Sequence, residues 1–255
     1  MTTPNAPAAE TTDDGILNGR LRLLQPKRGH RFGHDAILLA AAVPARTGDR
    51  VAEFGAGVGA ASLALLARVP GIDVTLFEID PALCALAQQN IHRNSFSNSA
   101  RAVVQDVTTP LRAGPFDHIL MNPPFNDSRL QPSADAGRRL AHAAGPDLLP
   151  RWINNARTAL RDGGAVTLIW RAERLAQLRQ ALETAGFGTV SMLPVVPAPE
   201  RTAIRVIAVG VKGGTAPPRT LSPLILNDEA SRPSAEAEAI LRHGAALPTA
   251  QQNAA

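Results

Sequence analysis

Residues 51–59 read Val51-Ala52-Glu53-Phe54-Gly55-Ala56-Gly57-Val58-Gly59, and an Ala/Leu-rich stretch follows over 60–68. A short apolar run that leads into closely spaced glycines and then a helical pattern predicts a buried strand, a tight loop and a helix. Glycine lets the backbone turn sharply and approach a ligand closely. The stretch therefore predicts the opening of a nucleotide-binding βαβ unit in an α/β fold.

Further apolar runs predict that the same sheet continues along the chain. We expect parallel strands over 73–77, 102–105, 116–121 and 165–170, with helices alternating between most of them. The runs 189–196 and 203–211 are joined by a short connection, which predicts an antiparallel hairpin. Together with 51–54, these runs predict a Rossmann-like, mostly parallel seven-stranded sheet that ends in an antiparallel hairpin.

Two acidic residues follow predicted strands at the edge where an open parallel sheet binds its ligands. Glu78 comes about 20 residues after the glycine loop, where an acidic side chain holds ribose hydroxyls. Asp106 closes the next strand and is placed to accept a hydrogen bond from an adenine amino group. Either carboxylate alone has a simpler interpretation as a solvated strand end. The glycine spacing suits a dinucleotide as well as S-adenosylmethionine, so a nicotinamide-dependent dehydrogenase stays open at this point.

The fourth predicted strand runs into Asn122-Pro123-Pro124-Phe125. Neither proline can continue a central strand because each lacks a backbone N–H, so the strand is expected to end at Met121. The side-chain oxygen of Asn122 and the carbonyl of Pro123 can each accept an N–H bond from a flat amine, and Phe125 can stack on its ring. The simpler interpretation is a turn with a packed phenylalanine.

Length and composition describe a large globular domain. The 255 residues include 45% apolar residues and no stretch long enough to span a membrane. Residues 1–13 have neither a basic start nor an apolar run, and we interpret them as a disordered tail rather than a signal peptide. Cys84 is the single cysteine, which predicts a cytoplasmic location and a buried rather than nucleophilic role. No zinc-ligand spacing occurs, so no metal is expected.

The positive charge is carried by arginine. The net charge is +4 and the isoelectric point about 10.4, while lysine occurs only at Lys27 and Lys212. Arginine forks match phosphate oxygens, so a polyanionic partner such as RNA is expected. A bias toward arginine across the whole genome would explain the same composition. The candidate substrate-binding residues lie before the glycine loop and beyond the fourth strand: Arg28, Arg31, Arg138 and Arg139.

Segments outside the predicted sheet have their own signals. Asn18-Gly19 between apolar residues predicts a hairpin, and Asp35 is expected to cap a helix that ends near residue 43. Residues 126–145 form a long polar loop of the kind that often acts as a lid. His142 in that loop has two interpretations, a proton acceptor or an exposed side chain. Beyond the hairpin, 217–227 is expected to be extended and 234–243 helical.

The glycine loop, Glu78, Asp106 and Asn122-Pro123-Pro124-Phe125 together resemble a class I S-adenosylmethionine-dependent methyltransferase over about residues 46–212. In such enzymes Asn-Pro-Pro-Phe/Tyr marks methylation of a planar nitrogen, which is adenine N6, guanine N2 or a glutamine amide. The stretch 31–40 and the segment from Lys212 to Leu226 look like the valine-tRNA adenine-N6-methyltransferase family. This narrower resemblance divides the chain into the tail at 1–13, a hairpin and capping helix at 14–45, the methyltransferase domain at 46–212 and an extension at 213–255.

The resemblance implies a role for each matching residue. Glu53, Gly55 and Gly57, followed by Gly59, would cradle the methionine part of the cofactor, while Glu78 would hold its ribose and Asp106 its adenine. Asn122, Pro123, Pro124 and Phe125 would hold the target amine, and the segment from Gly33 to Asp35 would cover the cofactor. The chain departs from the usual pattern at Glu53, where aspartate is commoner, and it contains no tyrosine.

The sequence thus predicts methyl transfer to adenine N6 in RNA, most simply tRNA beside the anticodon, at nucleotide 37. Guanine N2 in rRNA and a protein glutamine are alternatives with the same chemistry. A catalytically silent RNA-binding subunit is an alternative of another class, against which the intact glycine loop argues. The sequence indicates no oligomeric state.

Overall fold

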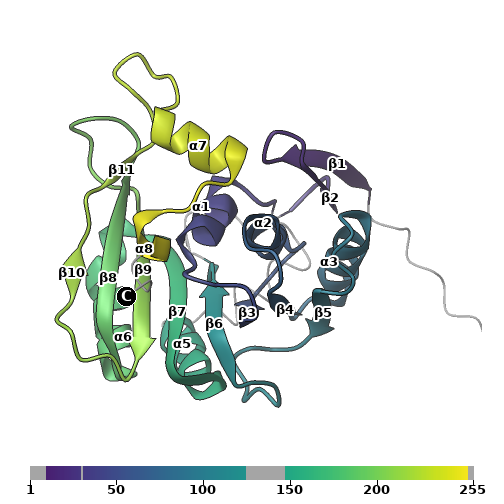
Figure 1. The fold of residues 1–255 in the computed structure, drawn as a ribbon, viewed down its shortest axis with the longest axis horizontal. Coiled ribbons are helices and arrows are strands. Elements are labelled where there is room, and N and C mark those ends of the chain that lie inside the picture. Colours follow the sequence, from purple (N-terminus) through teal and green to yellow (C-terminus); the bar gives the residue numbers. More distant parts are fainter. Residues whose placement is uncertain (1–9, 30, 125–146, 252–255) are drawn as a thin grey trace, which may run out of the picture.

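A mixed nine-stranded sheet forms the middle of the molecule in a computed structural model that describes residues 10–29, 31–124 and 147–251 (Figure 1). Its order is β10-β8-β9-β7-β6-β3-β4-β5, and β11 also pairs with β8. The strands are β3 (Arg50–Phe54), β4 (Asp73–Glu78), β5 (Ala100–Val104), β6 (Phe116–Met121), β7 (Leu160–Arg171), β8 (Phe187–Val196), β9 (Arg205–Lys212), β10 (Arg219–Thr220) and β11 (Leu224–Ile225).

The parallel part of the sheet explains the apolar runs of the sequence. Strands β5, β4, β3, β6 and β7 are parallel neighbours, and the central β3, β4 and β6 are buried along most of their length. The last hairpin is antiparallel, as predicted, with β9 between β7 and β8. The predicted count of seven strands is too low, because the two-residue strands β10 and β11 also pair with β8, on the side away from β9.

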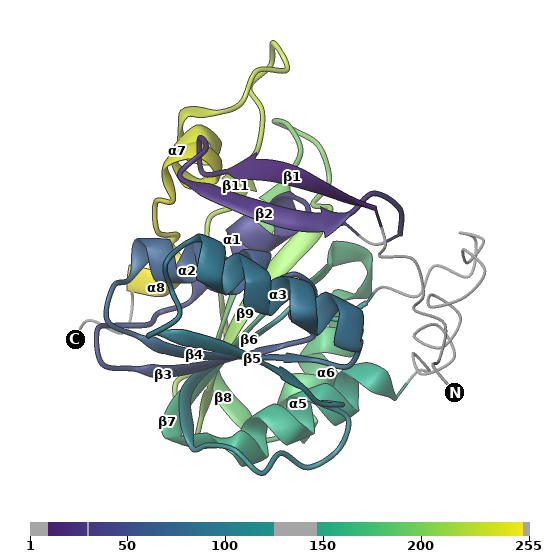
Figure 2. The same ribbon diagram turned by 90° about the vertical axis from the view of Figure 1, so that its right-hand side faces the viewer.

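Helices cover both faces of the sheet (Figure 2). On one face lie α1 (His34–Ala42), α2 (Ala60–Arg68) and α3 (Pro81–Arg93). On the other lie α5 (Leu148–Ala159) and α6 (Leu175–Thr184), the latter preceded by the short 3-10 helix η1 (Ala172–Arg174). Each face has its own apolar core. Cys84 of α3 is buried, in agreement with its predicted structural role.

An N-terminal hairpin lies along α3. Strands β1 (Thr11–Ile16) and β2 (Leu21–Pro26) pair across a turn that contains Asn18 and Gly19, both with positive φ. The hairpin therefore begins three residues before the predicted boundary at residue 14, so residues 11–13 do not belong to a disordered tail. The reason is pairing: Asp13 accepts hydrogen bonds from Arg22 and from Arg93 of α3.

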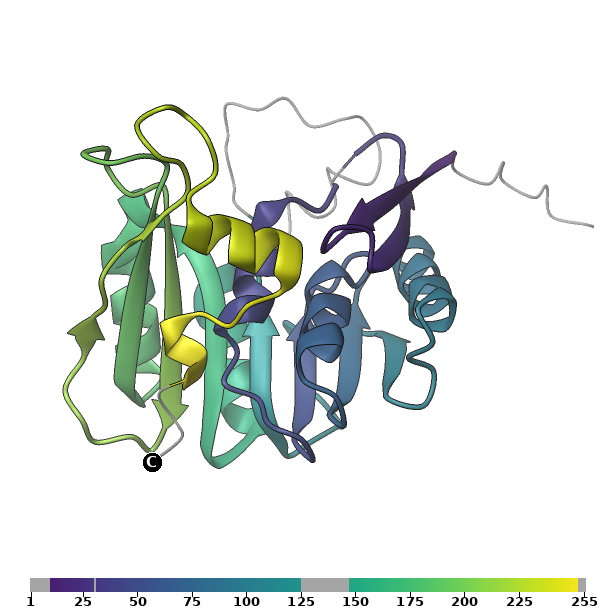
Figure 3. The same cartoon turned by 45° about the horizontal axis from the view of Figure 1, so that its top comes forward.

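The C-terminal segment packs on the helical layer beside α1 (Figure 3). It contains α7 (Ala235–His243) and α8 (Pro248–Gln251), and Ser234 caps α7 by accepting a hydrogen bond from the amide of Ala237. The amide of Leu247 donates to the carbonyl of Ala41 at the end of α1. Among the described residues, no helix has the length and apolar character needed to cross a bilayer.

The predicted cap of α1 is wrong. Gly33 occupies the N-cap position with extended backbone, and no side chain accepts a capping hydrogen bond there. Asp35 lies in the first turn, and its carboxylate instead accepts a hydrogen bond from Nε of Arg205 on β9, at 2.8 Å. The partner comes from 170 residues along the chain, which local sequence could not indicate.

Candidate active site

The carboxyl ends of three adjacent parallel strands bring the main candidate residues to one edge of the sheet. In the register, Phe54 at the end of β3 lies opposite Phe77 of β4 and Met121 of β6. The glycine loop, Glu78 and Asn122 each follow one of these positions in the sequence. Open α/β sheets bind ligands at this edge, so the predicted constellation is assembled in space.

The three glycines of the loop all have left-handed backbone, with φ of +67° at Gly55, +55° at Gly57 and +87° at Gly59. A Cβ atom at Gly55 would lie 2.5 Å from the ring of Trp152, and one at Gly59 would lie 2.8 Å from Leu76. A Cβ atom at Gly57 would meet nothing within 4 Å. Packing thus explains two of the glycines, whereas Gly57 faces open space that a ligand can occupy.

Glu78 links the end of β4 to the glycine loop. Its side chain is buried; one carboxylate oxygen accepts from the amide of Gly57 at 2.7 Å, and the other accepts from the amide of Asp80 at 2.9 Å. Asp80 in turn caps α3 by accepting from the amide of Ala82 at 2.8 Å. The carboxylate therefore fixes the loop and keeps negative charge beside Gly57.

Glu53 lies in the penultimate position of β3 and is buried. One of its oxygens accepts from both the amide and the hydroxyl of Ser62, at 3.0 and 2.5 Å. Burial raises the pKa of the Glu53 carboxyl from 4.5 to about 8, although the bonds from Ser62 act in the opposite direction. The side chain is therefore mostly protonated at neutral pH in the cofactor-free protein.

Asn122 follows β6 at the same edge, and its side-chain oxygen is buried. Within the part of the chain that the structure describes, this Oδ1 accepts no hydrogen bond. A buried amide oxygen without a donor costs roughly 1–3 kcal/mol, so this oxygen is a candidate acceptor for the N–H group of a ligand. Pro123 is buried beside it. Phe125, Arg138, Arg139, His142 and the predicted lid at 126–145 lie outside the described residues.

Asp106 lies two residues beyond β5, where its carboxylate accepts from the amide of Thr108 at 2.8 Å. Two large apolar side chains near it are exposed: Ile79, directly after Glu78, is 44% exposed, and Val104, opposite Glu78 in the register, is 53% exposed. Neither was among the residues predicted for the site. An apolar residue directly after the acidic strand end was the available signal, because an apolar side chain there has no strand left in which to be buried.

The segment before α1 departs from its predicted role. The guanidinium of Arg31 donates hydrogen bonds to Pro26, Thr12 and Asp14 of the hairpin, so it stabilises the hairpin. Asp35 is bound to β9, which is three strands away from β3 in the sheet order. Arg28 is exposed. Substrate binding by Arg28 and Arg31, and cofactor contact by Gly33 and Asp35, stay predictions.

Comparison with known proteins identifies the family of this chain. The family model described as methyltransferase small domain matches residues 31–194. The chain belongs to this family. It is an S-adenosylmethionine-dependent methyltransferase with a Rossmann-like α/β fold.

Relatives with named activities are about a quarter to a third identical to the methyltransferase over the aligned residues. A tRNA1(Val) (adenine(37)-N6)-methyltransferase of Actinobacillus pleuropneumoniae is 26% identical, over 77% of this chain and 83% of its own length. The corresponding enzyme of Bacteroides thetaiotaomicron is 25% identical, over 69% of this chain and 75% of its own. A release factor glutamine methyltransferase of Deinococcus radiodurans is 32% identical, over 54% of this chain and about half (51%) of its own.

Solved structures agree on the fold. A protein of Agrobacterium tumefaciens described as a predicted O-methyltransferase has a TM-score of 0.70 at 27% identity, covering 84% of this chain and 98% of its own. A 16S rRNA N2 methyltransferase of T. thermophilus, in complex with AdoMet and guanosine, has a TM-score of 0.55 at 23% identity. It covers 82% of this chain and 52% of its own.

The residues at the sheet edge fit S-adenosylmethionine, the cofactor of the methyltransferase. That molecule carries an ammonium group, ribose hydroxyls and an adenine amine, which all donate hydrogen bonds to carboxylates. The edge offers such acceptors at Glu78 and Asp106, an open approach at Gly57, and apolar side chains at Ile79 and Val104. The acceptors of the protein match the hydrogen-bond donors of the cofactor, and the open space at Gly57 leaves room for it.

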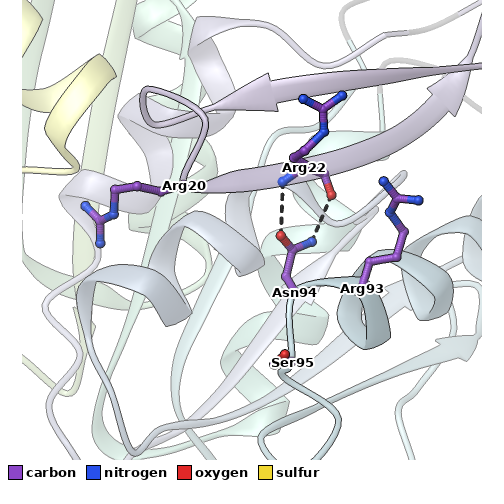
Figure 4. A pocket seen from close by; sticks show the side chains of 5 residues that line it. All are labelled: Arg20, Arg22, Arg93, Asn94 and Ser95. Atoms are coloured by element: carbon purple, nitrogen blue, oxygen red, sulfur yellow. Dashed lines mark hydrogen bonds between the residues drawn. The ribbon is translucent and has the colours of Figure 1, made fainter.

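A second feature of the methyltransferase is a basic groove of about 430 Å³ between the hairpin and the end of α3 (Figure 4). The side chain of Asn94 links the two sides of the groove by hydrogen bonds to the backbone N–H and C=O of Arg22. Asp13 accepts from Arg22 at 3.2 Å and from Arg93 at 2.7 Å, so one carboxylate faces two cations. The groove is lined by Arg20, Arg22, Arg93, Asn94 and Ser95.

Proposed function

We propose that the methyltransferase acts in the cytoplasm on the N6 amine of an adenine in RNA, with nucleotide 37 of a tRNA as the expected target. The observation that carries this proposal is the buried Oδ1 of Asn122 at the end of β6, one strand from the glycine loop, which accepts no hydrogen bond from any residue that the structure describes. Relatives named as tRNA1(Val) (adenine(37)-N6)-methyltransferases align over most of their length, which supports the same substrate class.

The proposed chemistry is electrostatic positioning of a weak nucleophile. The lone pair of an exocyclic amine is delocalised into the base. If Oδ1 of Asn122 and the carbonyl of Pro123 each accept one N–H, the nitrogen becomes pyramidal and its developing positive charge is stabilised. S-adenosylmethionine supplies an electrophilic methyl group on a sulfonium. Because the methyl group would leave a cationic sulfonium as a neutral thioether, and the methylated nitrogen could then lose its proton to solvent, the residues need to orient the amine rather than to provide a strong base.

The target base has to leave its stack to reach this edge, as base-modifying enzymes require. We propose that Phe125 stacks on it, with Pro124 holding the loop, and that Arg28, Arg138 and Arg139 contact RNA phosphates. Arg31 can take part only to the extent that its hairpin bonds leave donors available.

The proposed cofactor contacts follow the order of the strands. Glu53 and the loop from Gly55 to Gly59 receive the methionine part, with Gly57 as the point of closest approach. Glu78 holds the ribose hydroxyls and Asp106 accepts from the adenine amine. This arrangement explains why the exposed Ile79 and Val104 are apolar, because they would line the two sides of the adenine ring.

The direct test is to incubate the purified protein with methyl-labelled S-adenosylmethionine and total tRNA. The RNA is then digested and its nucleosides are identified by mass spectrometry. We expect the label in N6-methyladenosine from one tRNA species. A label in N2-methylguanosine, or no transfer to any RNA, would contradict the proposal.

A protein glutamine is the second candidate substrate. A primary amide also presents a planar NH2, so the Asn122–Pro123 acceptors suit it, and relatives named release factor glutamine methyltransferases match about half of their own length. The arginine-lined groove favours RNA. Incubation with a release factor under the same conditions separates the two, and binding of S-adenosylmethionine by calorimetry separates both from a silent subunit.

A further inference from the structure

Exposed large apolar side chains mark the functional edge of the sheet. Among the described residues these are Ile79, Val104 and Ile204, which are 44%, 53% and 44% exposed. Ile79 and Val104 lie at the ends of the parallel strands β4 and β5. Ile204 directly precedes the antiparallel β9, so it lies at the same edge. The proposed cofactor contacts explain the exposure of Ile79 and Val104, but they do not explain the exposure of Ile204.

The sheet register places Ile204 at the same edge of the sheet as Asn122, two strands away and three residues further along the strand direction. Arg171 at the end of β7 pairs with Arg205 of β9, and β7 is the direct neighbour of β6. Strand β9 is therefore two strands from β6, a separation of about 10 Å. Two backbone hydrogen bonds hold Ile204 in this position: its carbonyl accepts from Ala172 at 3.3 Å, and its amide donates to Val195 at 2.9 Å.

Ile204 is one wall of a groove of about 610 Å³. Leu175, Pro194 and Ala203 supply further apolar surface, and Thr202 supplies a hydroxyl. Arg171 and Arg205 also line the groove, where Glu173 accepts from Arg171 at 3.2 Å and Asp35 from Arg205 at 2.8 Å. Each guanidinium is ion-paired with a carboxylate, so the groove combines an apolar surface with arginine N–H groups held in position.

We propose that this groove is the subsite for the nucleotide next to the target base, with the flanking base packed on Ile204 and its phosphate near Arg171. The inference rests on the proposed RNA substrate. When the target base leaves its stack, the neighbouring base loses one stacking partner and exposes an apolar face. An apolar surface about 14 Å from Asn122 at the same edge, two strand spacings across and three residues along, replaces that partner, and the arginine N–H groups that flank it bind the adjacent phosphate.

The test combines protein and RNA changes in a double-mutant cycle. Once the target position is known, short RNAs are made with an abasic site on its 5′ or its 3′ side. We expect Ile204→Ala to lower kcat/KM on intact RNA by about fivefold or more, as expected for loss of base packing. One of the two abasic RNAs should lower the wild-type value by a similar factor, and Ile204→Ala should lose little further on that RNA.

Two controls keep the result specific. Ile204→Leu keeps the apolar surface and should retain most of the activity on intact RNA. The affinity for S-adenosylmethionine and the melting temperature should be unchanged in both variants, because Ile204 is exposed and lies outside the proposed cofactor contacts.

The outcomes separate this inference from the function on which it rests. If the wild-type protein methylates RNA but Ile204→Ala keeps full activity, the subsite is wrong and the proposed function stands. The subsite is also wrong if the losses from Ile204→Ala and from each abasic RNA multiply as independent effects. If the wild-type protein methylates no RNA, the proposed function and the subsite both fail.

Discussion

At the scale of single residues, the glycine loop allows packing to be separated from ligand approach. Gly55 and Gly57 have similar positive φ values, so an alanine at either position adds a backbone cost of about 1–2 kcal/mol. Only at Gly55 would the new methyl group also meet a buried ring, that of Trp152.

We therefore predict that Gly55→Ala lowers the free energy of unfolding by about 1–3 kcal/mol more than Gly57→Ala does. Gly57→Ala should mainly weaken the binding of S-adenosylmethionine. Urea unfolding and calorimetric titration of both variants measure the two effects. Equal destabilisation, or an unchanged cofactor affinity in Gly57→Ala, would contradict the assignment of open space at Gly57 to the cofactor.

Glu53 gives a pH dependence with a defined sign. Its pKa is about 8 in the folded protein and near 4.5 when exposed, so between these values the folded state binds the extra proton. The stability that this group contributes is present below pH 4.5 and is lost as the pH rises through about 8.

We predict that Glu53→Gln has a melting temperature close to that of the wild type at pH 5 and higher than that of the wild type at pH 9, both without cofactor. The amide oxygen of the variant can still accept the two bonds from Ser62. A melting-temperature difference that stays constant with pH would contradict the protonated state of Glu53.

Individual residues also show what the sequence could predict about the site. Glu78 and Asn122 lie at the predicted edge, because strand ends and prolines are local signals. Asp35 and Arg31 have partners that local patterns do not contain, on β9 and on the hairpin. The groove at Ile204 depends on the order of strands in the sheet, which a single sequence does not give.

At the scale of elements, α3 and the N-terminal hairpin are joined by two asparagines with different surroundings. Asn90 is fully buried and bonds both the N–H and the C=O of Leu24, as well as the carbonyl of Val58. Asn94, one helical turn later, bonds the N–H and C=O of Arg22, and these bonds are exposed.

We predict that Asn90→Ala lowers the free energy of unfolding by roughly 2–4 kcal/mol, because it leaves buried backbone groups unpaired. Asn94→Ala is the matched control and should cost about 1 kcal/mol or less, since water can replace its bonds. Urea unfolding gives both values. A larger loss for Asn94→Ala would mean that the hairpin is held chiefly at its exposed end.

The long elements were predicted well, and the short ones were not. Helix α2 has the predicted limits because its apolar spacing is a local signal. Strand β7 begins at Leu160 rather than at residue 165, because residues beyond the helix also pair with β6 across a bulge. Strands β10 and β11 have two residues each and exist only because the edge of β8 is available.

At the scale of the whole molecule, the C-terminal segment belongs to the main core. Leu224, Ile240 and Leu247 are almost fully buried in the cluster that contains α1 and the N-terminal hairpin. Residues from both sides of 46–212 thus complete one core. The boundaries 46–212 and 213–255 describe sequence resemblance, and we propose that the described chain folds as one unit.

The distribution of charge over the surface provides a test of the RNA partner. If the basic groove contacts two phosphates through Arg22 and Arg93, replacing both by glutamine should reduce the slope of log affinity against log salt by about 2. Arg232→Gln with Arg242→Gln is the matched control, because both are exposed ion-paired arginines of the C-terminal segment. The slope comes from filter-binding titrations with tRNA. Equal changes in the two double variants would assign the effect to net charge alone.

The central claim is that Asn122 orients a planar amine and does not hold the cofactor. Methyl transfer and S-adenosylmethionine affinity measured side by side for Asn122→Ala test this claim most directly. We predict that kcat falls by about 10²–10³, the usual cost of losing one transition-state hydrogen bond, while the Kd of the cofactor changes by less than about twofold. Asn122→Ala with near wild-type turnover, or with a comparable loss of cofactor affinity, would contradict it.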